Sequence, residues 1–271
     1  MTGPGLLTPR SGRVAGARRL SQRKHREREG RFLVEGPQAV REALGSGRLI
    51  EVYASAAFAV RHPDDAAALA AAGVPVHPCD DAALAALAGS VTPQGVVGVA
   101  AADTTTLDEV LSRRPRLLVL LHEVRDPGNA GAVVRVADAA GADAVVLSAA
   151  SVDVGNDKVV RSSTGSVFHL PVVAGEQTLA TVTALQRAGI RVLAADVADG
   201  AVDLDDVTDS GGLAPRTAWL FGNEAHGLAG ELLAAADAIV RVPIHGRAES
   251  LNLATAAAVC LYASARAQRR R

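Results

Sequence analysis

Short apolar runs alternate with segments of helical pattern from residue 117 to 268, and this alternation constrains the fold more than any other feature. The apolar runs predict strands at Leu117–Val124, Ala144–Ser148, 167–173, 190–195, Ala218–Phe221 and Ala238–Val242. The segments between them predict helices at Ala130–Ala140, 157–164, 177–188, 229–236 and from about Leu251 onward, with an acidic loop at 199–212. Strands that are apolar along their length and are followed by helices predict a parallel sheet covered on both faces. Ligands of such α/β sheets usually bind beyond the carboxyl ends of the strands.

A smaller block of alternating pattern precedes this one. Strands are expected at Arg31–Glu35, Leu49–Ala54, Val74–His77 and Gly95–Ala101, with helices at Pro37–Leu44, 64–72 and 80–88 between them. A polar stretch follows the last of these strands and marks a domain boundary. The sequence therefore predicts four parts: a basic N-terminal arm (1–30), a small α/β domain (31–102), a linker (103–116) and a larger α/β domain (117–271).

Composition excludes several classes of protein. Of the 271 residues, 49% are hydrophobic and only 3% are aromatic, so the core must be built from Ala, Val and Leu. Two cysteines, Cys79 and Cys260, make neither a disulfide framework nor a zinc site, which favours a reducing cytoplasm. No run of eighteen apolar residues occurs, which argues against a membrane span.

Positive charge is concentrated at the two ends of the chain. The formal net charge is −1, yet residues 1–31 carry nine basic side chains against two acidic ones. Residues 32–265 hold 15 basic and 27 acidic side chains, a net charge of −12. An acidic body with arginine-rich ends favours contact with a polyanion, since arginine binds phosphate through two parallel hydrogen bonds. Tails that only keep the protein dissolved give the same pattern.

Polar residues gather in a first loop that follows the strand at 117–124. Asn129 is a candidate helix cap, and Arg135 lies between two valines on an otherwise apolar helix. An unpaired cation is costly on such a face. A helix N-terminus with an arginine beside it therefore predicts a phosphate or carboxylate site.

Two further loops carry polar residues at the ends of predicted strands. After the strand at 218–221, Gly222 and Gly227 let the backbone approach a ligand, and Glu224 offers a carboxylate that accepts hydrogen bonds or helps to move a proton. After the strand at 238–242, Ser250 is a good N-cap for the closing helix. Asn252 is then expected inside the first turn, where an amide needs a hydrogen-bond partner.

Common enzyme motifs are absent from the sequence. It contains no G-x-G-x-x-G after a strand, no G-x-x-x-x-G-K-[ST], no H-E-x-x-H, no G-x-S-x-G and no C-x-x-C. A standard dinucleotide fold, a P-loop enzyme, a zinc protease and a serine hydrolase are therefore unsupported.

Taken together, the three loops resemble the motifs of the SpoU/TrmH family of RNA 2′-O-ribose methyltransferases, in the SPOUT superfamily. The family's N-x-G-x-x-x-R stands here as Asn129, Gly131 and Arg135. Its G-x-E-x-x-G-[L/M] stands as Gly222, Glu224, Gly227 and Leu228. Its [IV]-P-x-x-G followed by S-L-N stands as 242–246 and 250–252. The resemblance covers about 117–268, and residues 31–44 also resemble the ribosomal-protein-like substrate-binding domain often placed ahead of it.

This resemblance implies a fold, a cofactor and a set of site residues. The fold would be a SPOUT-type α/β parallel sheet with a C-terminal trefoil knot, preceded by the small α/β substrate-binding domain. S-adenosylmethionine, without a metal, would be held by backbone groups around Leu220, Gly222, Val242, Ile244 and Leu251. The catalytic set would be Arg135, Asn129, Glu224, Ser250 and Asn252. The family works as a homodimer, and the small-residue closing helix suits that packing.

The resemblance also assigns the reaction and the partner. Arg135 would bind the RNA phosphate and assist deprotonation of the hydroxyl. Because arginine is a very weak base, stabilisation of the developing alkoxide describes its role better. The RNA is expected to be 23S rRNA rather than tRNA, and five basic residues are expected to contact it: Arg18, Arg19, Arg23, Lys24 and Arg26.

Three alternative functions remain at this point. One is a tRNA 2′-O-methyltransferase of the same family, and another is a non-catalytic RNA-binding relative, against which the intact motifs speak. The last is a metabolic enzyme that binds a nucleotide, a class that has no use for basic termini or for a separate first domain.

Overall fold

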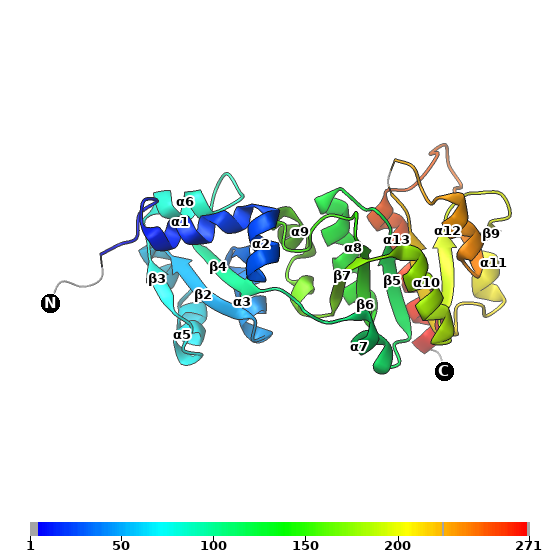
Figure 1. The fold of residues 1–271 in the computed structure, drawn as a ribbon, viewed down its shortest axis with the longest axis horizontal. Coiled ribbons are helices and arrows are strands. Elements are labelled where there is room, and N and C mark those ends of the chain that lie inside the picture. Colours follow the sequence, from blue (N-terminus) through cyan, green and yellow to red (C-terminus); the bar gives the residue numbers. More distant parts are fainter. Residues whose placement is uncertain (1–4, 224, 270–271) are drawn as a thin grey trace. The chain divides into compact units, whose positions relative to one another are not determined.

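The computed structural model describes residues 5–223 and 225–269. The described chain divides into two compact units (Figure 1). Unit 1 contains residues 1–102 and 155–169, and unit 2 contains residues 103–154 and 170–271. Among the described residues, no helix combines the length and the apolar character needed to cross a membrane.

Unit 2 is built on a seven-stranded sheet in the order β7-β6-β5-β10-β8-β11-β9. All neighbouring strands are parallel, which confirms the α/β parallel sheet expected from the sequence. Its strands are β5 (Leu117–Leu121), β6 (Ala144–Ser148), β7 (Val172–Glu176), β8 (Arg191–Ala195), β9 (Val202–Asp203), β10 (Thr217–Phe221) and β11 (Ala238–Arg241). Its helices are α7 (Leu107–Ser112), α8 (Pro127–Ala140), α10 (Thr178–Arg187), α11 (Leu204–Asp209), α12 (Gly230–Ala235) and α13 (Leu253–Arg269).

Helices cover both faces of this sheet. Leu118 and Leu120 of β5 belong to a core cluster that includes residues of α7, α10 and α12. Helices α8 and α13 pack against each other and against β5 on the opposite face. There Trp219, the only tryptophan, is completely buried and donates a hydrogen bond from Nε1 to Ser264 Oγ of α13 at 2.8 Å. Truncating such a buried side chain to alanine costs about 3–5 kcal/mol.

Unit 1 contains a four-stranded mixed sheet in the order β1-β4-β2-β3. Its strands are β1 (Arg31–Glu35), β2 (Leu49–Ala54), β3 (Val76–Pro78) and β4 (Val96–Ala101). Its helices are α1 (Gly12–Arg18), the 3-10 turn η1 (Arg19–Ser21), α2 (Arg23–Glu29), α3 (Pro37–Gly45), α4 (Ala56–Arg61), α5 (Pro63–Ala71), α6 (Asp81–Leu87), α9 (Asp157–Ser163) and the 3-10 turn η2 (Ser166–Phe168).

Residues 12–29 are not the free arm that their charge suggested. Val14, Ala17 and Leu20 lie three residues apart and are buried in one cluster with residues of β2, β4 and α6. These three side chains form an apolar stripe on the basic segment, and through this stripe the segment packs against the rest of unit 1. The N-terminal segment is therefore part of the small domain.

Two other expected boundaries also differ. The polar stretch 103–116 is not only a linker, because Leu107 and Val110 of α7 enter the core of unit 2. The strand expected at 167–173 begins only at Val172, since Val167 and Phe168 lie in a 3-10 turn that packs in unit 1. Phe168 stacks on Phe32 of β1, with ring centroids 5.9 Å apart.

Candidate functional site

A cavity of about 690 Å³ lies in unit 2 at the carboxyl ends of three neighbouring strands. Ala195, Phe221 and Arg241, the last residues of β8, β10 and β11, all line it. The loops that follow these strands complete the wall, together with the first turns of α8 and α13. This is the place that a parallel α/β sheet predicts for a ligand.

The loop after β10 folds back on itself through its two glycines. Asn223 and Gly227 exchange backbone hydrogen bonds of 3.2 and 2.8 Å, and Gly227 has a φ of +64°. A Cβ at Gly222 would overlap the backbone of Gly227 and would lie 2.9 Å from the nitrogen of Leu228. Only glycine fits at position 222 without moving the backbone. Glu224, the expected carboxylate of this loop, lies outside the described residues.

Side-chain hydrogen bonds hold both ends of this loop in place. Asn223 Nδ2 donates to the carbonyl of Glu123 at 2.8 Å. Asp196, which directly follows β8, accepts hydrogen bonds from the backbone nitrogens of Ala198 at 3.0 Å and Leu228 at 3.4 Å. Both Asp196 and Asn223 line the cavity, and neither was expected from the sequence. The signal for Asp196 was available, since an acidic residue directly follows the strand predicted at 190–195.

The first and third loops meet at one hydrogen bond. Asn252 Nδ2 donates to Asn129 Oδ1 at 2.9 Å, and both residues line the cavity. Asn252 Oδ1 also accepts from the backbone nitrogens of Ala254 at 2.9 Å and Thr255 at 3.4 Å. Asn252 is therefore the N-cap of α13, which begins at Leu253, and the expectation that Ser250 caps this helix is wrong.

Helix α8 begins three residues earlier than expected. Asp126 is its N-cap, because one carboxylate oxygen accepts from the backbone nitrogen of Asn129 at 2.7 Å. Asn129 therefore lies in the first turn, with its side-chain oxygen directed to Asn252 rather than to the helix backbone. Arg135 lies further along α8 on its exposed side, outside the cavity lining. The argument that Arg135 sits on an apolar face is wrong, because Val133, Val134 and Ala137 form the buried side.

The residues expected to hold a cofactor separate into two groups. Gly222, Val242, Ile244 and Leu251 line the cavity, as does Ser250 of the expected catalytic set. Leu220 does not, because its side chain is fully buried in the core of unit 2. Leu220 is the residue before Phe221, which ends β10 and lines the cavity.

An ion pair fixes the end of β11 beside the cavity. Arg241 Nε lies 2.5 Å from a carboxylate oxygen of Asp203. The hydrogen bond from Arg241 lowers the pKa of the Asp203 carboxyl and raises the pKa of Arg241. Among the residues that the structure describes, no group of three or more His, Cys, Asp and Glu residues is placed to hold a metal ion.

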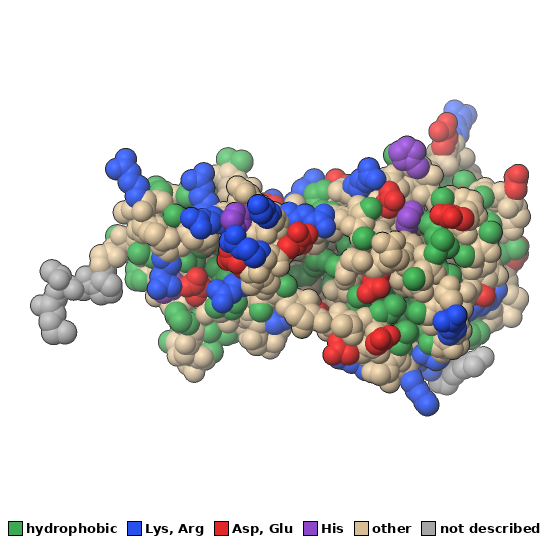
Figure 2. All heavy atoms as spheres, in the orientation of Figure 1, with side chains coloured by type: hydrophobic (Ala, Val, Ile, Leu, Met, Phe, Trp, Pro, Cys, Tyr) green, Lys and Arg blue, Asp and Glu red, His purple; other side chains and the backbone are tan. Residues whose placement is uncertain are grey.

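Basic side chains gather over α1 and α2 of unit 1 (Figure 2). Four of the five residues expected to bind RNA are exposed, namely Arg18, Arg19, Arg23 and Lys24. Arg26 is only 7% exposed, and its Nη1 donates to the carbonyls of Leu20 and Ser21, both at 2.8 Å. Arg26 therefore stabilises the turn between the two helices and is not a surface contact for RNA.

Two family models match the chain. The SpoU rRNA Methylase family matches residues 116–262, which include the cavity and its loops. The MRM3-like substrate binding domain matches residues 12–98, which include α1 and α2.

Known proteins are similar over most of the chain. A 23S rRNA (guanosine(2553)-2′-O)-methyltransferase of Bacillus subtilis is 33% identical over 90% of this chain and 92% of its own length. A 23S rRNA (uridine(2479)-2′-O)-methyltransferase of Streptomyces viridochromogenes is 35% identical over 64% of this chain and 61% of its own length. The crystal structure of an AdoMet-bound rRNA methyltransferase from Sinorhizobium meliloti has a TM-score of 0.82 and 30% identity, covering 97% of both chains.

Proposed function

The chain belongs to the SpoU rRNA methylase family, and we propose that it transfers a methyl group from S-adenosylmethionine to a ribose 2′-hydroxyl of 23S rRNA. One observation carries this proposal. The hydrogen bond between Asn129 and Asn252 joins the first and third family motifs at the edge of the cavity whose wall the second motif forms. The named activity of the B. subtilis relative supports the choice of rRNA.

The cavity suits S-adenosylmethionine in size and chemistry. Its volume falls within the range of roughly 300–1,000 Å³ typical of small-molecule pockets. Val242, Ile244 and Leu251 give it apolar surface, and Gly222 lets the loop backbone at Gly227 pack closely against it. We include the backbone of Leu220 in this set, and add Asp196 as a carboxylate acceptor for hydroxyl groups. When bound, the cofactor supplies an electrophilic methyl group on its sulfonium.

In methyl transfer, side chains of the chain are proposed to orient the ribose and to stabilise charge. A 2′-hydroxyl is a poor nucleophile, so the enzyme must position it and favour loss of its proton. Arg135 is proposed to bind the neighbouring phosphate and to stabilise negative charge that develops on the hydroxyl oxygen. Asn129, Ser250 and Asn252 are proposed to orient the ribose and the loops, with Glu224 completing the set.

A trefoil knot and a homodimer are part of this proposal. Gly222 and Gly227 line the same cavity as Ile244 and Leu251, and this closeness of two loops supports a C-terminal segment threaded through a knot. On α13, Val259 is 39% exposed and Tyr262 is 54% exposed, so this helix carries apolar surface that a second copy would cover. Light scattering after size-exclusion chromatography tests the dimer, and a monomer would contradict it.

RNA is the proposed partner, in the cytoplasm where rRNA is made and modified. Arg18, Arg19, Arg23 and Lys24 are exposed on unit 1 and suit contacts to phosphate groups. Because such contacts release counterions, we expect the affinity for RNA to fall steeply as the salt concentration rises.

Calorimetric titration with S-adenosylmethionine, and with the product that lacks the methyl group, tests the cofactor site. We expect saturable binding of both ligands with one site per chain. If neither ligand binds, both in the presence and in the absence of RNA, the proposal is contradicted.

A further inference from the structure

A second cavity, of about 270 Å³, lies within unit 1. It is formed where β1 ends, where α3 begins, along the loop after α6, and on one side of α9. All of its lining residues belong to unit 1, and the methyl-transfer proposal uses none of them. Helix α9 comes from the sequence matched by the SpoU family model but folds with the substrate-binding unit.

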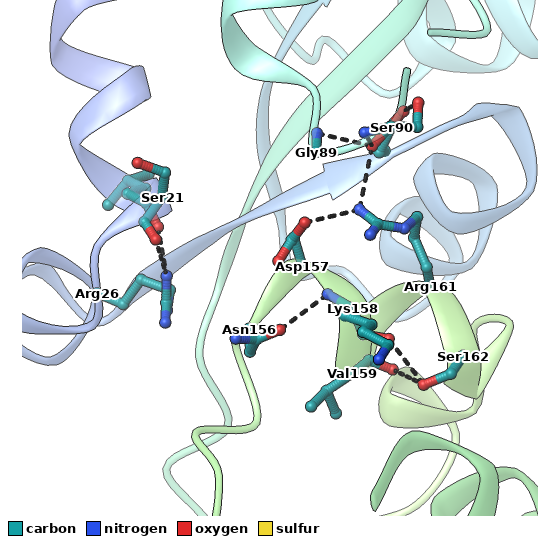
Figure 3. Close-up of polar contacts among 12 residues, drawn as sticks. Ser21, Arg26, Gly89, Ser90, Asn156, Asp157, Lys158, Val159, Arg161 and Ser162 are labelled. Atoms are coloured by element: carbon teal, nitrogen blue, oxygen red, sulfur yellow. Dashed lines mark hydrogen bonds and ion pairs between the residues drawn. The ribbon is translucent and has the colours of Figure 1, made fainter. Parts of the chain in front are cut away.

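Three lining residues, Glu35, Ser90 and Arg161, belong to a polar cluster, and Figure 3 shows the contacts of Gly89, Ser90, Asp157 and Arg161 in it. The Glu35 carboxylate is 8% exposed and accepts hydrogen bonds from the backbone nitrogens of Gly89 at 3.0 Å and Ser90 at 3.2 Å, and from Ser90 Oγ. Arg161 Nη1 lies 2.7 Å from Asp157 and 3.4 Å from Glu35. A Cβ at Gly89 would overlap the Asp157 carboxylate, so glycine lets this loop lie against the ion pair. The wall is thus preorganised before any ligand arrives.

The charge of this cluster argues against an anionic ligand. Two carboxylates, Glu35 and Asp157, already face the single guanidinium of Arg161. Among the described residues, the only charged ones that line the cavity are Glu35 and Arg161, so a phosphate would find no uncompensated positive charge there. The cavity therefore suits a neutral group.

Uncharged side chains with spare hydrogen-bonding capacity surround the opening. The side chains of Thr92 and Gln94 make no hydrogen bond to any residue that the structure describes. Gln38 makes one bond, 3.5 Å long, from Nε2 to the carbonyl of Thr164. Each amide offers both donors and acceptors, and Ala39 and Val160 add buried apolar surface.

We propose that this cavity binds one unpaired base of the RNA substrate, an inference that rests on the proposed function. A nucleobase is neutral, flat and rich in donors and acceptors along its edge, as the lining requires. Proteins read RNA sequence mainly from such unstacked bases. The exposed Arg18, Arg23 and Lys24 of the same unit would hold the phosphates, and this cavity would add recognition of a base.

Nuclear magnetic resonance of the full chain saturated with S-adenosylmethionine tests the proposal directly. The probes are the four nucleoside 5′-monophosphates, with ribose 5-phosphate as the control that lacks a base. They are added up to about 10 mM, since a single-base contact is weak. We expect at least one monophosphate to shift the side-chain amide signals of Gln38 and Gln94 saturably, while ribose 5-phosphate leaves them in place. Equal shifts from ribose 5-phosphate, or no shift from any probe, would overturn the proposal.

Matched variants separate this cavity from the cofactor site. Gln94→Ala is expected to lower the affinity for the bound monophosphate at least about fivefold. The control variant Gln177→Ala, which removes an exposed amide in unit 2, should leave this affinity unchanged. In methyl transfer to transcribed 23S rRNA, Gln94→Ala should raise KM for RNA and leave kcat unchanged. Full affinity in Gln94→Ala would refute the base site. Failure of S-adenosylmethionine to shift the Gly222 signal would instead contradict the proposed function.

Discussion

Replacing Asn252 tests how the site is held together, because this one side chain has two separable contacts. Its Oδ1 caps α13, and its Nδ2 donates to Asn129. Loss of an N-cap costs about 1 kcal/mol. Loss of the hydrogen bond to Asn129 adds about 0.5–1 kcal/mol, at the low end of the usual range because Asn252 is exposed to water. Asn252→Ala should therefore destabilise unit 2 by about 1.5–2 kcal/mol, or lower its Tm by about 3–8 °C.

Two further variants divide this loss between the contacts. Serine caps a helix about as well as asparagine but is too short to reach Asn129, so Asn252→Ser should lose only about 0.5–1 kcal/mol. Asn129→Ala should lose a similar amount, and the double variant Asn129→Ala with Asn252→Ala should lose no more than Asn252→Ala alone.

Calorimetric thermal unfolding and urea titration of the unchanged protein and the four variants measure these differences. The reasoning fails if Asn252→Ser is as unstable as Asn252→Ala. It also fails if the losses in the double variant are additive, because then the two side chains do not interact.

Three other predictions follow from the site and the core. Arg135→Ala should lower methyl transfer at least about 100-fold while S-adenosylmethionine still binds, and the exposed Arg187→Ala should match the unchanged enzyme. Gly222→Ala should weaken S-adenosylmethionine binding at least about tenfold in calorimetry, because its Cβ pushes the loop backbone apart. Burial raises the pKa of Cys79 to about 11 and that of Cys260 to about 12, so both thiols stay protonated, and resistant to a thiol reagent, at pH 8.

Specific outcomes would contradict each of these. Full activity in Arg135→Ala would remove its proposed role, and unchanged cofactor affinity in Gly222→Ala would place the cofactor elsewhere. Rapid labelling of either cysteine in the folded protein at pH 8 would show that the cores of the two units open readily.

The parallel sheet could be predicted because its strands carry their own signal. Leu117–Leu121 and Ala144–Ser148 are apolar at every position, as strands buried on both faces must be. The N-terminal helices could not be predicted, because Val14, Ala17 and Leu20 are isolated among basic residues that dominate the pattern. The strand expected at 167–173 was misplaced since apolar Val167 and Phe168 fit a 3-10 turn in another unit equally well.

The site was predictable where a short motif fixes local geometry and not where distant segments meet. Of the motif residues, Asn129, Gly222, Gly227 and Asn252 line one cavity. The partner of Asn252 lies 123 residues away in sequence, so its dual role as cap and as donor to Asn129 depends on tertiary structure. Arg26 could not be told from its basic neighbours, because only the folded turn brings the carbonyls of Leu20 and Ser21 to its guanidinium. The catalytic roles of Arg135 and Glu224 stay predictions.

The most direct test is to incubate the protein with unmodified 23S rRNA transcript and S-adenosylmethionine, and then to locate the methyl group by mass spectrometry of nuclease digests. The account predicts a methyl group on a ribose 2′-oxygen of the rRNA. This methyl group should be absent when the Arg135→Ala variant is used in place of the unchanged protein. A methyl group on a base, or an unmodified rRNA from protein that binds S-adenosylmethionine and the transcript, would contradict it.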